Sequence, residues 1–289
     1  MVEMQGRNPT RRNRNIGTPK SGYGQNNRMT VPEVAHGDHV FWERIDSATE
    51  VSRTVSGRVL RFFIQPTRAD CIHACTVDDI ARLMSNVPPA DWEGLETVVL
   101  RQPRRKEQAL ASVWGRLSYF AELVNRRGDV LYSGPAIVIE AVNPTEPLKF
   151  GKSLSLDDAA ELERLRSDGH KVRLGDRNHT IEPTLESCRA TQLYRTMPHE
   201  LGHWVDFLEK VQRPSATLGP DEEADHYGGL LDRYHSRPQR EKEHFAHAYG
   251  ERLRERLEAI RAIPFDRELD LGQVKKDGLR LENFRLSQS

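Results

Sequence analysis

The stretch Thr196-Met-Pro-His-Glu-Leu-Gly-His-Trp-Val-Asp206 sets the fold that we expect of this chain. It places His199 and His203 four residues apart, with Glu200 directly after the first histidine. On an α-helix, side chains four positions apart lie on one face, so both imidazoles can reach a single metal ion. Glu200 then lies one position round the helix, where its carboxylate can contact a water held at that ion. This pattern is typical of a hydrolytic zinc site with two ligands and a general base.

The residues around the motif favour a buried helix. The apolar positions follow the i, i+3, i+4, i+7 rule of an amphipathic helix (Leu201, Trp204, Val205, Leu208). Gly202 is a poor helix former, so we expect it to permit a close backbone approach. Pro198 removes one helical donor. The sequence leaves two alternatives there: either the helix kinks, or a new helix begins with Thr196 as its cap.

A hydrolytic zinc site needs a third protein ligand and one open position. Glu243, 40 residues after His203, is the best candidate because it opens a strong helical pattern at residues 240–260. The small residues Ala246 and Ala248 would let that helix approach the motif helix closely. Two other ligands are possible on spacing, Asp206 and His247. An aspartate so near on the same helix more often supports a ligand histidine from behind, and that is the role we expect of Asp206.

At this point the sequence resembles a known family. His199-Glu-Leu-Gly-His-Trp-Val-Asp206 and Glu243-His-Phe-Ala-His-Ala-Tyr249 are similar to the two motifs of gluzincin metallopeptidases related to the catalytic domain of anthrax lethal factor. The resemblance covers about 50 residues at the level of motifs. It implies that His199, His203 and Glu243 bind Zn²⁺ and that Glu200 is the general base. It also implies an α+β, zincin-like fold, in which a small mixed twisted sheet packs on the motif helix and on a C-terminal helix that bears the third ligand.

The resemblance further implies a tyrosine upstream of the third ligand that assists the reaction. Tyr234 is the nearest match, but it lies two residues further from Glu243 than the family pattern places it. His235 and Tyr249 are alternative donors to the oxyanion.

Composition and charge set limits on the class of protein. The chain has 289 residues, 37% hydrophobic and 30% charged, which predicts a globular protein with a substantial core. A formal net charge of zero argues against nucleic acid as the main partner. Apolar runs are too short for a membrane span, and the N-terminus has no signal-peptide core, so we expect a cytoplasmic protein, with export by a non-classical route as the alternative. Three cysteines argue against a disulfide framework, and Cys71 and Cys75, without a second metal-binding pair, are expected in the core.

The pattern of residues predicts three regions. Residues 1–35, with six Arg/Lys against two Glu, are expected to form a disordered basic tail. Residues 36–263 are expected to form the catalytic domain, with an insertion at 144–183, and residues 264–289 a C-terminal extension. We expect the following strands and helices: strands at 58–64, 95–100, 112–120 and 135–142; helices from Thr76, from Ser155 to 167, from Thr184, around 227–234 and at 240–260; and a hairpin at 171–181.

These expectations combine into a zinc-dependent endopeptidase with a polypeptide substrate. Ala136–Ala141, within the strand expected at 135–142, is expected to form the sheet edge against which an extended substrate pairs. The alternative is a zinc-stabilised binding or regulatory module without hydrolysis, whose basic tail contacts nucleic acid or a partner. The sequence does not indicate the oligomeric state or the cleavage specificity.

Overall fold

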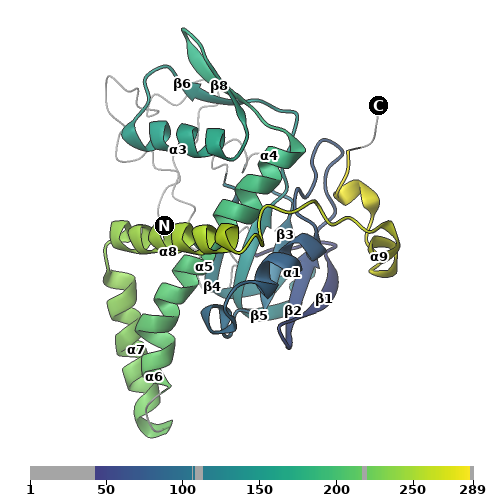
Figure 1. Ribbon diagram of the computed structural model, residues 1–289. Coiled ribbons are helices and arrows are strands. Elements are labelled where there is room, and N and C mark those ends of the chain that lie inside the picture. The colour runs from purple at the N-terminus through teal and green to yellow at the C-terminus, as the bar shows by residue number, and fades with distance from the viewer. Residues whose placement is uncertain (1–42, 106, 108–112, 217–219, 287–289) are drawn as a thin grey trace, which may run out of the picture. The chain divides into compact units, whose positions relative to one another are not determined.

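The computed structural model describes residues 43–105, 107, 113–216 and 220–286 (Figure 1). Phe41–Ser289 form one compact unit. The predicted basic tail at residues 1–35 lies outside the described residues. None of the helices in the described ranges has the length and apolar character that a membrane span requires.

The fold is mixed α+β, as predicted, and it contains two sheets. The larger sheet has five strands in the order β1-β2-β3-β5-β4, and the smaller one has three in the order β6-β8-β7. In the larger sheet β2, β3 and β5 are parallel, whereas β1 and β4 run antiparallel to their neighbours. The strands are β1 (Thr49–Val55), β2 (Arg58–Ile64), β3 (Thr97–Arg101), β4 (Gly115–Val124), β5 (Val130–Glu140), β6 (Leu148–Gly151), β7 (Lys171–Leu174) and β8 (Asn178–Glu182).

The sheet order corrects one prediction about the substrate edge. The strand predicted at 135–142 corresponds to the later part of β5, which ends at Glu140 and lies between β3 and β4 rather than at an edge. Continuous apolar residues are typical of a strand buried on both faces, and Ile137 and Val138 are fully buried. The edge beside the motif helix is β4. A bulge interrupts its pairing with β5 between Ser118 and Ala121, where Pro135 has no N–H to donate.

Helices cover one face of the larger sheet (Figure 1). The main core lies on that face and includes Phe62 and Ile137 from the sheet and Leu201 and Leu257 from helices. A smaller cluster around Phe63 and Val138 covers the other face. The helical elements are α1 (Val77–Ser85), η2 (Pro89–Trp92), α3 (Leu156–Ser167), α4 (Leu185–Ala190), η3 (Thr191–Thr196), α5 (Met197–Phe207), η4 (Leu208–Gln212), α6 (Arg213–Ser215), α7 (Pro220–Ser236), α8 (Gln239–Ala259), α9 (Leu271–Lys276) and η5 (Leu281–Asn283).

Local sequence signals define the starts of α1, α3 and α4. Thr76 caps α1 by accepting a hydrogen bond from the Asp79 amide at 2.9 Å, and the Asp79 carboxylate accepts one from the Thr76 amide at 3.0 Å. Ser155 and Thr184 form the same reciprocal cap at α3 and α4. These three predicted helix starts are confirmed because a cap depends only on residues three positions apart.

The segment before the motif helix is continuous rather than capped. The chain remains helical from α4 through the π-helical η3 into α5. Thr196 has helical dihedral angles, and its hydroxyl donates to the Thr191 carbonyl at 3.0 Å. The alternative in which a new helix begins with Thr196 as its cap is therefore wrong. A π-helical turn precedes Pro198, a distortion often found beside functional sites.

The region at 144–183 contains α3 and the smaller sheet, and it is attached to the motif helix by polar groups. Asp168 accepts hydrogen bonds from the Thr191 hydroxyl at 2.8 Å and from Arg195 Nε at 2.7 Å. Arg195 also pairs with Glu161 of α3 at 3.0 Å. His170 contacts the Thr191 hydroxyl through Nε2 at 2.9 Å. These contacts connect the region to the turn immediately before His199.

The C-terminal residues contribute to the core and do more than extend the domain. Phe284 is 1% exposed and belongs to the main core. Arg267 donates from Nη2 to the carbonyls of His73 and Phe284, at 3.0 and 2.9 Å. The described part of this segment, residues 264–286, therefore closes the core on the side of α1.

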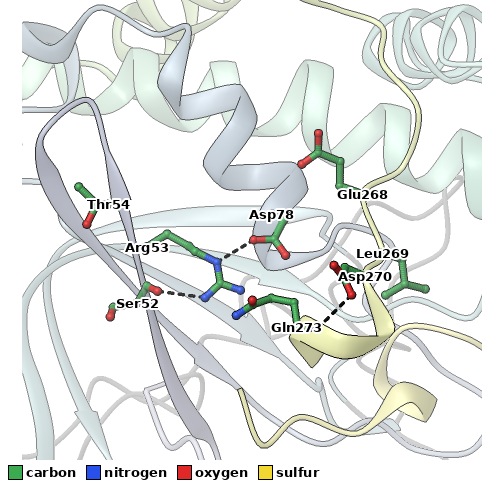
Figure 2. Close-up of a pocket in the computed structure, with 8 residues that line it drawn as sticks. All are labelled: Ser52, Arg53, Thr54, Asp78, Glu268, Leu269, Asp270 and Gln273. Carbon is green, nitrogen blue, oxygen red and sulfur yellow. Dashed lines mark hydrogen bonds and ion pairs between the residues drawn. The ribbon is translucent and has the colours of Figure 1, made fainter. Parts of the chain in front are cut away.

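A polar pocket of about 760 Å³ lies between β1, the start of α1 and this C-terminal segment (Figure 2). Arg53 in the pocket pairs with Asp78 at 2.7 Å and with Asp277 at 2.5 Å. Glu268, which also lines the pocket, pairs with Arg82 at 2.6 Å. Because these charges bind one another, the pocket joins three segments of the fold and does not present a candidate catalytic group.

Candidate metal centre

Helix α5 presents the two motif histidines side by side, as the four-residue spacing predicts. The ring centroids of His199 and His203 are 4.7 Å apart, with the rings nearly perpendicular. His203 is 9% exposed, and Leu201 and Trp204 on the other face are buried. The amphipathic pattern of α5 therefore turns both imidazoles away from the core and toward α8.

Helix α8 brings Glu243 to the histidines. Glu243 Oε2 lies 3.3 Å from His199 Nε2 and 3.6 Å from His203 Nε2. One ligand atom from each of the three side chains lies within 4.8 Å of the others. Ligands at about 2.1 Å from a tetrahedral zinc ion are separated from one another by about 3.4 Å. The two distances from Glu243 Oε2 match that geometry, so these residues can hold a divalent metal ion.

The crossing of α5 and α8 depends on glycine at two positions. A Cβ atom at Gly202 would lie 2.7 Å from the Ala246 carbonyl oxygen and 2.8 Å from its Cα. A Cβ atom at Gly250 would lie 3.2 Å from the His199 amide nitrogen. The close approach predicted for Gly202 is confirmed. It brings the α8 backbone near enough for the short Glu243 side chain to reach both imidazoles.

Charge complementarity holds this group together. Hydrogen bonds from His199 and His203 lower the pKa of Glu243 far below its usual range. Glu243 therefore presents an anionic oxygen to the imidazoles. Gln239, one turn earlier, donates to the other oxygen, Oε1, at 2.6 Å. That bond leaves Oε2 directed at the histidines. His199 Nδ1 is buried and has no hydrogen-bond partner among the described residues.

Glu200 is buried beside the group and bonded to the edge strand. Its side chain is 8% exposed, and its Oε2 accepts a hydrogen bond from the Leu117 amide of β4 at 2.8 Å. Burial raises the pKa of Glu200, while the charges of His199 and His203 and the Leu117 bond oppose that shift. A carboxyl group with a raised pKa is better matched to accepting and returning a proton near neutral pH.

Asp206 has a different role from the one that the sequence predicts. It is fully buried, and its carboxylate pairs with Lys210 and with Arg237, the latter at 2.7 Å. No hydrogen bond joins Asp206 to either motif histidine among the described residues. The expectation that Asp206 supports a ligand histidine is therefore wrong. Its interaction with Arg237 instead ties the α7–α8 junction to the end of α5.

The three candidate donors to an oxyanion lie in different surroundings. Tyr234 is 2% exposed, and its hydroxyl is 2.9 Å from that of Tyr119 on β4. Tyr249 is buried and donates to Asp91 Oδ2 at 2.7 Å, which commits it to the core. His235 is exposed, with its ring 6.5 Å from the Tyr119 ring. The structure therefore places Tyr234 behind Tyr119, a residue that the sequence did not single out.

His247 lies beside the group without joining it. Its ring centroid is 4.4 Å from that of His199. Among the described residues, neither His247 nor Asp206 belongs to the set whose ligand atoms cluster. Burial lowers the pKa of His247, with the charge of His199 acting in the same direction.

Several contributors to the site were missed by reasoning from the sequence. They are Leu117, Tyr119, Arg237 and Gly250. Gly250 could have been identified from the sequence, because a glycine within a long helical pattern often marks a close contact. The others depend on contacts between distant segments. Comparisons with protein-family models, curated protein sequences and solved structures find no match for this chain.

Proposed function

We propose that the chain is a zinc-dependent endopeptidase with a gluzincin-like site, in which His199, His203 and Glu243 bind the metal. The observation that carries the proposal is the convergence of these three side chains, whose ligand atoms lie within 4.8 Å of one another, beside the buried carboxylate of Glu200. Two histidines and a glutamate are a ligand set of catalytic zinc sites that keep one position open. A site that served stability alone would not need Glu200.

The position of the edge strand β4 favours a polypeptide as the substrate. Among the described residues, β4 pairs with β5 on one side, and on the other side only its C-terminal end is paired, by a bridge between Arg44 and Val124. It runs beside α5, as the contact between Leu117 and Glu200 shows. An extended peptide that pairs with this edge would place a backbone carbonyl near the three ligands. The proposed zincin-like fold consists of this mixed sheet, its antiparallel edge strand and the crossed helices α5 and α8.

Glu200 carries the proton chemistry in this proposal. A zinc ion bound by the three ligands would lower the pKa of its coordinated water toward about 7 and polarise the substrate carbonyl. Glu200 takes a proton from the attacking water and later gives it to the leaving amine. The Leu117 amide fixes the orientation of the Glu200 carboxylate. Glu200 itself is buried, and its electrostatic contacts are stronger there than in bulk water.

The substitution Glu200→Gln tests the mechanism. We expect the variant to retain one zinc ion per chain and to lose hydrolysis of unfolded casein by roughly 10³-fold or more, because general acid–base catalysis contributes about 10²–10⁴-fold. The measurements are zinc content by mass spectrometry and peptide release, with and without a chelator. If the Gln variant cleaved casein at the wild-type rate, the mechanism would be wrong. Zinc-loaded wild type without any hydrolysis would favour a zinc-stabilised binding module instead.

A further inference from the structure

Tyr119 lies on the part of β4 that borders the candidate metal centre. It follows Leu117 by two residues, at the start of the bulge in β4. Both pack against the main core on the helix side of the sheet. The Leu117 amide holds Glu200. Tyr119 is half-buried, so part of it is accessible from outside, whereas Tyr234 behind it is 2% exposed.

Aromatic neighbours fix the Tyr119 ring. Its centroid lies 4.7 Å from that of Phe207 at the end of α5 and 5.8 Å from that of Tyr234 on α7 in an edge-on arrangement. Its hydroxyl meets the Tyr234 hydroxyl at 2.9 Å. The phenol is thus held between three elements rather than lying free on the surface, and a held donor loses little entropy on bonding a substrate.

The surroundings of Tyr119 keep its hydroxyl protonated. Burial raises the pKa of Tyr119 to about 12, and the carboxylates of Asp206, Glu200 and Glu243 act in the same direction. Tyr119 is therefore a neutral donor at physiological pH. It lies within electrostatic range of both the proposed base and the proposed third ligand.

We propose that Tyr119 is the phenol that donates a hydrogen bond to the scissile carbonyl oxygen as negative charge develops there, and that Tyr234 is a positioning residue behind it. This inference rests on the proposed endopeptidase function. In this arrangement the Tyr234 hydroxyl donates its hydrogen bond to the Tyr119 oxygen rather than to the Asp206 carboxylate, which also approaches it, and the Tyr119 proton is left for the substrate. A hydrogen bond that Tyr119 accepts also makes it a stronger donor. Both tyrosines act only as hydrogen-bond donors, and each keeps its proton throughout the reaction.

The test compares Tyr119→Phe, Tyr234→Phe and the double variant, using a fluorogenic peptide that spans the most rapidly cleaved bond of casein. We expect Tyr119→Phe to lower kcat by roughly 10- to 100-fold, because loss of one oxyanion donor costs up to about 10²–10³-fold. KM and zinc content should remain within about twofold, since the bond forms in the transition state. Tyr234→Phe should lower kcat by roughly 3- to 10-fold, and it should add little in the Tyr119→Phe background.

Binding of a phosphonamidate analogue of the same peptide gives a readout that does not require turnover. Its charged oxygens imitate the tetrahedral intermediate, so Tyr119→Phe should weaken it by the same factor as kcat. Tyr132→Phe is the matched control, because Tyr132 packs on the opposite face of the sheet and its hydroxyl donates to the Pro135 carbonyl at 3.0 Å. We expect that control to match wild type in all measurements.

Two results would overturn the inference. One is an unchanged kcat and phosphonamidate affinity in Tyr119→Phe. The other is a loss in Tyr234→Phe that is as large in the Tyr119→Phe background as in wild type, which would make Tyr234 the donor. Either result would leave the endopeptidase proposal intact if wild type cleaves and Glu200→Gln does not. Failure of the endopeptidase proposal would instead appear as the absence of zinc-dependent cleavage in wild type.

Discussion

Glu243 is the residue whose placement depends most on the fold. The two histidines are set by a five-residue motif, whereas Glu243 reaches them from another helix across 40 residues of sequence. Its Oε2 atom lies at similar distances from both imidazoles, 3.3 and 3.6 Å. The sequence could propose this residue because it opens a strong helical pattern, but only the helix crossing brings it into range.

Replacing Glu243 by alanine should abolish tight metal binding. We expect zinc affinity to fall by more than about 100-fold. Loss of a residue that only hydrogen-bonds a metal ligand already costs about 10- to 100-fold, and loss of a ligand itself should cost more. The measurement is competition with a chelating dye. Glu241→Ala is the control, because Glu241 lies in the same turn of α8 and its ion pair with Arg237 at 3.6 Å is peripheral to the site. Undiminished affinity in Glu243→Ala would point to His247 as the third ligand.

Asp206 shows where residue-level prediction fails. Its position three residues after His203 suggested support for a ligand, yet its carboxylate is taken by Lys210 and Arg237. Arg237 lies 31 residues away, in the junction between α7 and α8. No pattern of neighbouring residues predicts such an ion pair, because its geometry depends on how two helices pack.

At the scale of elements, the crossing of α5 and α8 holds the site together. Gly202 lies against the Ala246 backbone, which cannot move aside as a flexible side chain could. Gly229 on α7 provides a contrast, since a Cβ atom there would meet nothing within 4 Å. The same substitution should therefore have opposite effects at the two positions.

We expect Gly202→Ala to lower the free energy of unfolding by about 1–3 kcal/mol, the usual cost of overpacking a core. It should also weaken zinc binding, because α8 must shift away from the histidines. Gly229→Ala should raise the free energy of unfolding by up to about 1 kcal/mol, since alanine is the better helix former. Urea unfolding of both variants provides the measurement. Equal stability of the two variants would show that the helices are not in close contact at Gly202.

At the scale of the whole molecule, the C-terminal segment packs over His73 and closes the core there. The His73 amide donates to the Asn283 carbonyl at 2.7 Å, and His73 Nε2 bonds the Gln65 carbonyl at 2.8 Å. Burial lowers the pKa of His73 from 6.5 to about 4. A histidine held neutral in this way must be protonated more readily in the unfolded chain than in the folded one.

This difference predicts acid lability. Between pH 6.5 and about 4 the unfolded chain binds a proton that the folded chain rejects, so stability is full above pH 6.5 and falls as the pH decreases through this range. Over this pH interval the free energy of unfolding falls by about 3 kcal/mol because of His73. His73→Leu should be less stable at pH 7 but should lose less stability on acidification. Urea unfolding at a series of pH values gives the slopes.

The exposed residue His226 on α7 provides the control. His226→Gln should keep the wild-type slope, because an exposed imidazole is solvated in both the folded and the unfolded state. Comparing variants with wild type also cancels contributions from acid release of metal, which all three proteins share. A slope in His73→Leu as steep as in wild type would contradict the assignment to His73.

The sequence by itself determined the features whose signals are local. These are the paired imidazoles on α5, the capped starts of α1, α3 and α4, the strand at 58–64 and the apolar face of the motif helix, because each depends on residues within a few positions of one another. The tertiary structure alone decided that β4 rather than β5 is the edge, that Asp206 binds Arg237, and that Tyr119 stands in front of Tyr234. Each of these depends on which distant segments pack together, and that choice is made by the burial of the whole core rather than by any short pattern.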